Sequence, residues 1–241
     1  MGTLPFLLQT AVVTRALFLL PFEGRRKYAR LVEAIARDPK ARVTFYRRFL
    51  LVWWLTSFIV TVSLVQAHAP RGSLMLRPLQ LGLSTWAVLG GFLAFLAWPV
   101  WRAREAGPYR DAVREQLARV PALLPGTRGE RWLFCAVSLT AGFCEELVFR
   151  GLIPEYFGLL VPALPWLGPA ISIAGFGIAH WYQGLRGVWI SAFLGAVFYF
   201  AMAVSGSVFA AMALHALNDL RFLALVLVLA RPPTDRREGS P

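Results

Sequence analysis

Two adjacent glutamates and an arginine stand out within an otherwise apolar stretch of this chain. Glu145 and Glu146 precede Arg150 in the run EELVFR. Charged side chains inside a bilayer are costly, so they tend to pair, face a polar cavity and serve a function. Glu146 and Arg150 are four positions apart, so they meet on one helix face and the guanidinium keeps the carboxylate ionised. Glu145 lies about 100° round the helix with no such partner in sequence, which suits a general base.

Two further groups add histidines and amide or carboxylate side chains. His180 ends the run FGIAH, and Phe176, four residues earlier, can pack against its ring. His215 begins the run HALND, which places Asn218 and Asp219 on the same helix face. The N–H groups of His and Asn could stabilise an oxyanion. Taken singly, each group could equally be an ion pair, a satisfied polar residue or a hydrogen bond between helices.

The composition indicates which elements hold these groups. Of 241 residues, 57% are hydrophobic and 16% charged, whereas soluble domains are about half apolar and a quarter charged. A spanning helix needs about 20 apolar residues. We therefore predict an all-α, polytopic helical membrane protein with six to seven transmembrane helices around a polar intramembrane cavity. The predicted spans are residues 49–66, 79–101, 130–160, 165–182, 188–204 and 208–230.

Residues 4–20 are also apolar, but Pro5 and Arg15 weaken them as a span. We predict an interfacial helix here, with a seventh span as the alternative. Two cysteines are too few for a disulfide framework.

The net charge of +12 is distributed unevenly along the chain. With six spans and a cytoplasmic N-terminus, the inside segments hold twenty Lys or Arg, and the outside loops hold only Arg71 and Arg77. This follows the positive-inside rule and predicts membrane lipids, not nucleic acid, as the partners of the basic residues. The expected location is the cytoplasmic (inner) membrane of a prokaryote. The predicted organisation is a basic interfacial segment (1–48), two spans with a cytoplasmic amphipathic helix (49–129), a core (130–230) and a disordered tail (231–241).

Helix lengths decide whether the three groups can meet. The midpoint between Glu146 and His180 falls in the Pro-containing segment 161–165, which predicts a turn. A second turn is predicted at 205–207. At 1.5 Å per residue, the glutamates and His180 lie about 25 Å below the first turn. His215 and Asp219 lie about 13–20 Å below the second. The groups can therefore converge in one cavity toward the cytoplasmic half of the membrane.

In this order on membrane helices, the patterns EExxxR, FxxxH and HxxxN/D resemble those of the CPBP family. This family comprises type II CAAX prenyl endopeptidases and bacteriocin-processing or immunity proteins of the Abi type. The resemblance covers about residues 130–230. It implies an intramembrane endopeptidase with an all-helical core around a polar cavity. The implied substrate is a membrane-anchored peptide or protein, CAAX-like or otherwise, cleaved near the cytoplasmic face.

The resemblance also implies roles for the motif residues. Glu145 would match the family's water-activating glutamate, assisted by His180. Glu146 and Arg150 would match its supporting pair, and His215 its histidine on the oxyanion side. No cofactor and no covalent intermediate are implied.

One position departs from the family pattern. The last motif residue, often Asn in the family, is Asp219 here, and Asn218 precedes it. An ionised Asp has no hydrogen to donate. Either Asp219 is protonated or positions His215, or Asn218 supplies the donor.

Three alternatives remain open at this stage. Two His and two carboxylates could hold zinc with an open position, although the HExxH motif is absent and Arg150 would disfavour a metal. A proton-coupled carrier could use the same groups as a relay. A non-catalytic binding or immunity protein could keep the fold without the chemistry.

Overall fold

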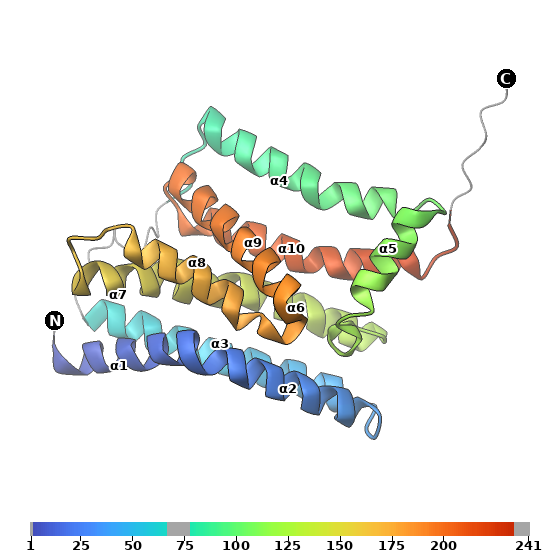
Figure 1. Ribbon diagram of the computed structural model, residues 1–241, viewed down its shortest axis with the longest axis horizontal. Helices are drawn as coiled ribbons and strands as arrows, with labels where there is room; N and C mark the ends of the chain where they lie inside the picture. The colour runs from blue at the N-terminus through green and yellow to red at the C-terminus, as the bar shows by residue number, and fades with distance from the viewer. Residues whose placement is uncertain (1, 67–77, 234–241) are drawn as a thin grey trace.

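The computed structural model describes residues 2–66 and 78–233. Within these ranges every regular element is a helix, which confirms the all-α prediction (Figure 1). The two outside-loop arginines, Arg71 and Arg77, and the part of the predicted tail beyond residue 233 lie outside the described residues.

The predicted membrane character is confirmed by the helix lengths. Six helical stretches of the described chain are long and apolar enough to cross a membrane, so the chain is an integral membrane protein. The helices lie roughly along the long axis of the molecule in Figure 1. The six stretches are Thr3–Ile35, Ala41–Gln66, Leu83–Arg102, Arg128–Leu160, Trp181–Ser205 and Val208–Leu229.

The N-terminal stretch consists of α1 (Thr3–Thr14), a π-helical segment and α2 (Leu20–Ile35). Pro5 does not interrupt it, because the first turn of a helix does not need that N–H. Arg15 forms an ion pair with Glu23 at 3.3 Å, so its charge is balanced. α1 packs against α3 (Ala41–Gln66). The structure therefore favours the alternative of a spanning helix for residues 4–20 over the predicted interfacial helix.

The predicted span 165–182 is wrong in length. The helix there, α8 (Leu167–Ala179), has 13 residues and falls short of a full crossing. It ends at His180, and a 3-10 turn over Trp181–Gln183 follows. Gly184 then adopts φ +81°, a conformation that side-chain-bearing residues rarely adopt, and the chain reverses into the next helix. The apolar composition of this stretch conceals the break.

The core consists of α6 (Arg128–Glu146), a π-helical segment (Leu147–Leu152), α7 (Ile153–Leu160), α8, α9 (Gly184–Ser205) and α10 (Val208–Leu229). Both predicted turns are confirmed. The chain reverses between α7 and α8 over residues 161–166, and between α9 and α10 at Gly206, which has φ +64°.

Glycines bring the core helices into backbone contact. A Cβ added at Gly142 would lie 2.7 Å from the Ala216 nitrogen, so α6 and α10 touch along this line. A Cβ at Gly177 would lie 2.8 Å from the Val188 oxygen, which joins α8 to α9 in the same way. Small residues allow such close packing in membranes. These contacts hold α6 close to α10 and α8 close to α9.

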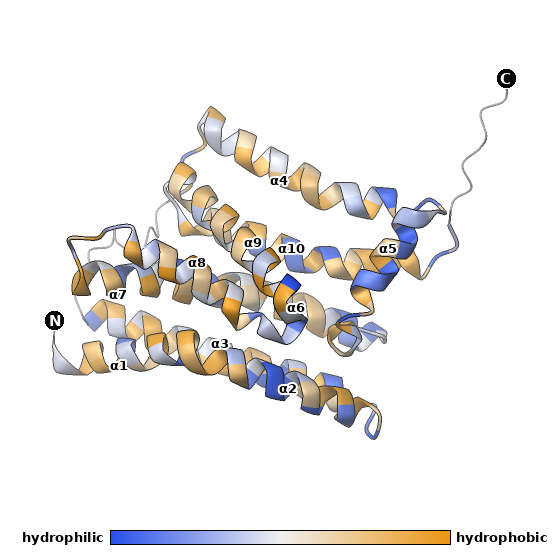
Figure 2. Ribbon diagram, in the orientation of Figure 1, coloured by the Kyte–Doolittle hydropathy of each residue, from blue (hydrophilic) through white to orange (hydrophobic). Residues whose placement is uncertain are grey.

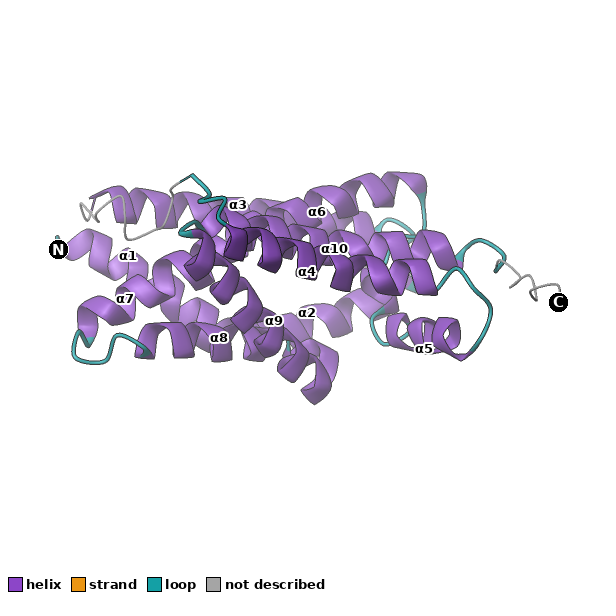
Figure 3. Cartoon of the chain, turned by 90° about the horizontal axis from the view of Figure 1, so that it is seen from above, coloured by secondary structure: helices purple, strands orange, loops and turns teal. Residues whose placement is uncertain are grey.

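The remaining helices are α4 (Leu83–Arg102) and α5 (Pro108–Leu117). α5 runs across the other helices near one end of the molecule in Figure 1, and Figure 3 shows it beside the ends of α4 and α10. Buried Arg110 on α5 donates to the carbonyls of Ala103, Leu229 and Arg231, which ties the ends of α4 and α10 together. Hydrophilic residues gather at this end and at the end of α2, whereas most of α4 and α9 is hydrophobic (Figure 2).

Candidate active site

Glu146 and Arg150 form a buried ion pair at the junction of α6 and the π-helical segment. Arg150 Nη1 lies 3.0 Å from Glu146 Oε1, and both side chains have 0% exposure. The predicted i,i+4 pairing is therefore present. Arg150 Nη2 also donates to the carbonyl oxygen of Gly195 on α9 at 2.8 Å. A Cβ at Gly195 would lie 3.0 Å from that nitrogen, so this contact depends on glycine.

Two aromatic rings complete the surroundings of the guanidinium. The Arg150 Cζ lies 4.4 Å from the ring centre of Phe176 and 5.6 Å from that of Phe198. Such cation–π contacts stabilise a charge that has been removed from water. Arg150 therefore joins the π-helical segment to α8 and α9 as well as to α6.

His215 completes the buried cluster from α10. Its Nδ1 lies 2.7 Å from Glu146 Oε1, the same oxygen that accepts from Arg150. The imidazole stacks on Phe198 with ring centres 5.1 Å apart and meets the edge of Phe176. A carboxylate can only accept, so Nδ1 carries the hydrogen of this bond. Sequence spacing paired Glu146 with Arg150 alone and did not foresee the contact with His215.

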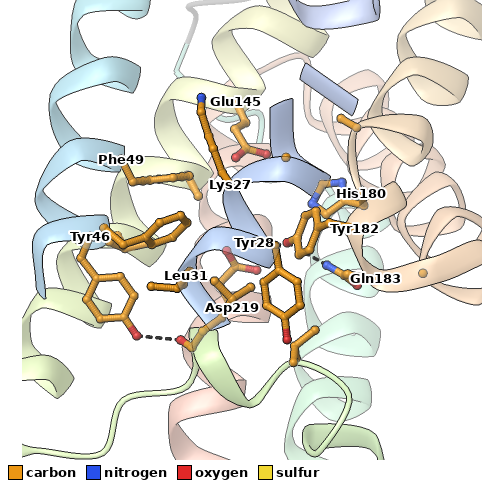
Figure 4. A pocket seen from close by; sticks show the side chains of 18 of the residues that line it. Lys27, Tyr28, Leu31, Tyr46, Phe49, Glu145, His180, Tyr182, Gln183 and Asp219 are labelled. Atoms are coloured by element: carbon orange, nitrogen blue, oxygen red, sulfur yellow. Dashed lines mark hydrogen bonds between the residues drawn. The ribbon is translucent and has the colours of Figure 1, made fainter. Parts of the chain in front are cut away.

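The two adjacent glutamates differ in their exposure to a cavity of about 820 Å³. Glu145 on α6 lines this cavity together with His180 at the end of α8 and with His215, Asn218 and Asp219 on α10. Figure 4 shows Glu145, His180 and Asp219 around it. Glu146 and Arg150 do not line it and lie behind its wall. The three motifs therefore converge as predicted, and only Glu145 of the glutamate pair faces the open space.

His180 is held by its own helix. Its Nδ1 lies 2.8 Å from the carbonyl oxygen of Phe176, and the two rings pack with centres 4.8 Å apart, as the spacing predicted. A backbone carbonyl can only accept, so Nδ1 carries the hydrogen. In the neutral ring, Nε2 then keeps a lone pair that can accept a hydrogen from water.

Asp219 and Asn218 lie beside the outer nitrogen of His215. Asp219 Oδ2 is 3.8 Å from His215 Nε2, and Asn218 Nδ2 donates to Asp219 Oδ1 at 3.3 Å. The Asn218 oxygen is buried with no hydrogen-bond partner among the described residues. Asp219 is thus placed to position His215, while one hydrogen of the Asn218 amide is directed to Asp219.

The lining of the cavity combines apolar and basic side chains. Its apolar lining comes mainly from α2, α3, α6 and α9, an environment suited to a hydrophobic chain segment. The basic lining residues are Arg15, Lys27, Arg30, Arg48, Arg119, Arg186 and Arg221. The apolar ones include Leu31, Phe49, Trp53, Leu123, Phe134 and Ile190.

The side chains do not form a ready metal site. A catalytic zinc usually takes three protein ligands. In the described part of the chain, no group of three or more His, Cys, Asp or Glu is arranged to hold a metal ion. The Nδ1 atoms of His180 and His215 bond to Phe176 and Glu146, which leaves Nε2 of each ring to face other groups. Among the described residues, the donors are thus not gathered into a three-ligand site.

Sequence reasoning missed three contributors to this site. Gly195 acts through its backbone carbonyl and Phe198 through its ring, and both lie in an apolar helix that gives no local signal. Tyr182 lines the cavity from the turn after α8. Its only sequence signal is its position two residues after His180.

Comparison with known proteins finds a match in the part of the chain that holds these residues. Residues 127–221 match the family model described as type II CAAX prenyl endopeptidase Rce1-like. The matched segment includes every predicted site residue, from Glu145 to Asp219. The match confirms the resemblance drawn from the motifs. No curated protein and no solved structure shows a significant match.

Proposed function

We propose that the protein is an intramembrane endopeptidase that hydrolyses a peptide bond in a membrane-anchored peptide or CAAX-like protein. One observation carries the proposal. Glu145 and His180 face a shared cavity among apolar helices, while Glu146 is withdrawn into contacts with Arg150 and His215. A carboxylate and a histidine that line one cavity suit water activation, and the buried Glu146 cluster suits a positioning role.

In the proposed reaction, Glu145 accepts a proton from a water molecule that His180 Nε2 helps to orient. The water oxygen attacks the scissile carbonyl carbon and forms a tetrahedral oxyanion. Collapse of this species breaks the C–N bond, and the proton held by Glu145 passes to the leaving amine. The reaction needs no covalent enzyme intermediate.

His215 is proposed to act on the oxyanion. Its Nδ1 hydrogen is directed to Glu146, so Nε2 donates only when the ring is an imidazolium. In that form the ring stands between Glu146 and Asp219, which supply compensating negative charge. Donors aimed at a developing oxyanion are often the largest single contribution to catalysis.

The orientation follows from charge. The positive-inside rule places the basic end, formed by the end of α2 and by α5, on the cytoplasmic side. Figure 1 shows that α1 begins at the opposite end of the molecule, because α1 and α2 run its whole length. We therefore propose that α1 begins on the non-cytoplasmic side, in place of the expected cytoplasmic N-terminus.

Replacing Asp219 tests the departure from the family pattern. Asp219→Asn is expected to keep substantial activity, because it preserves size and offers an N–H at the position where the family often has Asn. Asp219→Ala and His215→Ala are expected to lose about 100- to 1000-fold in rate, the usual cost of losing an oxyanion contact. The readout is turnover of a cleavable peptide at equal amounts of folded protein. Asn218→Ala is the neighbouring comparison, and full activity there combined with an inactive Asp219→Asn would contradict this assignment.

A chelator is expected to leave activity unchanged. The proposed reaction activates water with Glu145 and His180, and the described donor set does not converge on a metal. Activity would be measured before and after extended treatment with a strong chelator, with metal content followed in parallel. Loss of activity that one equivalent of Zn²⁺ restores would overturn the metal-free mechanism.

The function itself is tested with purified protein in liposomes. Internally quenched peptides, each with an apolar segment and varied flanking residues, would be incubated with the wild type and with Glu145→Gln. Products identified by mass spectrometry at defined peptide bonds, formed by the wild type alone, are the expected result. A complete absence of cleavage over the whole peptide set would favour a binding or carrier protein.

A further inference from the structure

Tyr182 is fixed in the wall of the cavity by its aromatic neighbours. Its ring centre lies 5.9 Å from that of His180 and 5.8 Å from that of Tyr28 on α2. Gly24 on α2 also faces the ring, since a Cβ there would lie 3.5 Å from it, an ordinary contact distance. The preceding residue, Trp181, is 50% exposed on the outside of the molecule. The 3-10 turn thus directs Tyr182 inward and its neighbour outward.

The hydroxyl of Tyr182 has a hydrogen to give. The Gln183 side-chain amide donates to the phenol oxygen at 2.9 Å, so this contact uses an oxygen lone pair and leaves the O–H hydrogen free. No acceptor among the described residues takes that hydrogen. Donation from the amide also polarises the O–H bond and strengthens it as a donor.

Tyr182 lines the same cavity as the residues that would need a further donor. Tyr182 lies among the cavity residues with Glu145, His180 and Asp219 (Figure 4). Asp219 has no hydrogen to give when ionised, and Asn218 directs an amide hydrogen to Asp219. His215 therefore lacks the companion donor that an Asn at position 219 would provide.

We propose that Tyr182 is a further catalytic residue, whose O–H donates a hydrogen bond to the tetrahedral oxyanion beside His215. The proposal rests on the endopeptidase function proposed above. It involves no proton transfer: the phenol keeps its hydrogen, and the hydrogen bond shortens as negative charge develops on the substrate oxygen. Tyr182 would thereby compensate for the aspartate at position 219.

Tyr182→Phe tests the proposal because it removes the hydroxyl and keeps the ring stacking. With an internally quenched peptide that the wild type cleaves, kcat is expected to fall about 100-fold with KM nearly unchanged. Tyr199→Phe is the matched control, since Tyr199 lies on α9 and does not line the cavity. That variant should keep wild-type kcat. Gln183→Leu keeps the phenol but removes its anchor, and about a 3- to 10-fold loss is expected.

A second readout separates an oxyanion contact from a structural effect. A phosphonate analogue of the same peptide carries anionic oxygens in place of the tetrahedral carbon. Its Kd should rise in Tyr182→Phe by the same factor by which kcat/KM falls. Binding of the uncleaved peptide is measured in Glu145→Gln, with and without Tyr182→Phe, and its Kd should stay constant. Wild-type kcat in Tyr182→Phe would overturn the proposal, and so would an equal weakening of phosphonate and substrate binding. If the endopeptidase function itself fails, the wild type does not cleave at all.

Discussion

Glu145→Gln is expected to abolish peptide hydrolysis while the protein still folds and inserts. The amide keeps the size of the side chain but cannot accept a proton from water. Loss of a general base typically costs about 100- to 10,000-fold in rate. Because Glu145 lines the cavity and makes no ion pair within the described structure, its replacement should not disturb the buried cluster around Glu146. Turnover of a quenched peptide in liposomes is the measurement.

The matched control for this change is Glu33→Gln. Glu33 is exposed on α2 and does not line the cavity, so the same chemical change there should leave turnover and thermal stability at wild-type values. Retention of more than about a tenth of wild-type turnover by Glu145→Gln would contradict its assignment as the base.

Arg150→Ala is expected to reduce both stability and activity. The change leaves Glu146 buried without its cation. It also removes the hydrogen bond to the Gly195 carbonyl and the cation–π contacts with Phe176 and Phe198. Breaking one side of a buried ion pair costs about 3–5 kcal/mol. The measurement is the free energy of unfolding in detergent, together with the yield of folded protein. Activity should fall as well, because Glu146 also positions His215.

Two comparisons isolate the buried charge as the cause. Arg25→Ala removes an exposed arginine from α2 and should change the free energy of unfolding by less than about 0.5 kcal/mol. Adding Glu146→Gln to Arg150→Ala removes the unpaired charge and should recover part of the lost stability. An Arg150→Ala protein with wild-type stability and activity would show that the pair does not support the site.

The parts of the site that sequence could predict are those set by local spacing. The contact of Glu146 with Arg150, and of Phe176 with His180, follows from positions four apart on one helix. The turn at 161–165 follows from its prolines. Helix rise then places the motifs at matched depth, and the cavity lining shows that they do converge.

The contacts that sequence could not predict join distant helices or depend on backbone shape. The His215–Glu146 bond spans 69 positions, and no periodicity encodes it. The carbonyl that accepts from Arg150 belongs to Gly195, which has no side chain to signal a polar contact. Similarly, the end of α8 at His180 depends on the turn conformation of Gly184, and hydropathy alone extends the apolar run through it.

The central claim is that this cavity cleaves peptide bonds of membrane proteins through Glu145. The most direct test compares the protein termini present in membranes of cells that make the wild type, Glu145→Gln or neither, with the two forms at equal abundance. We predict a defined set of new termini, in or beside apolar segments, that appears with the wild type and is absent from the other two samples. The same termini in the Glu145→Gln membranes, or none in the wild-type membranes, would contradict the account.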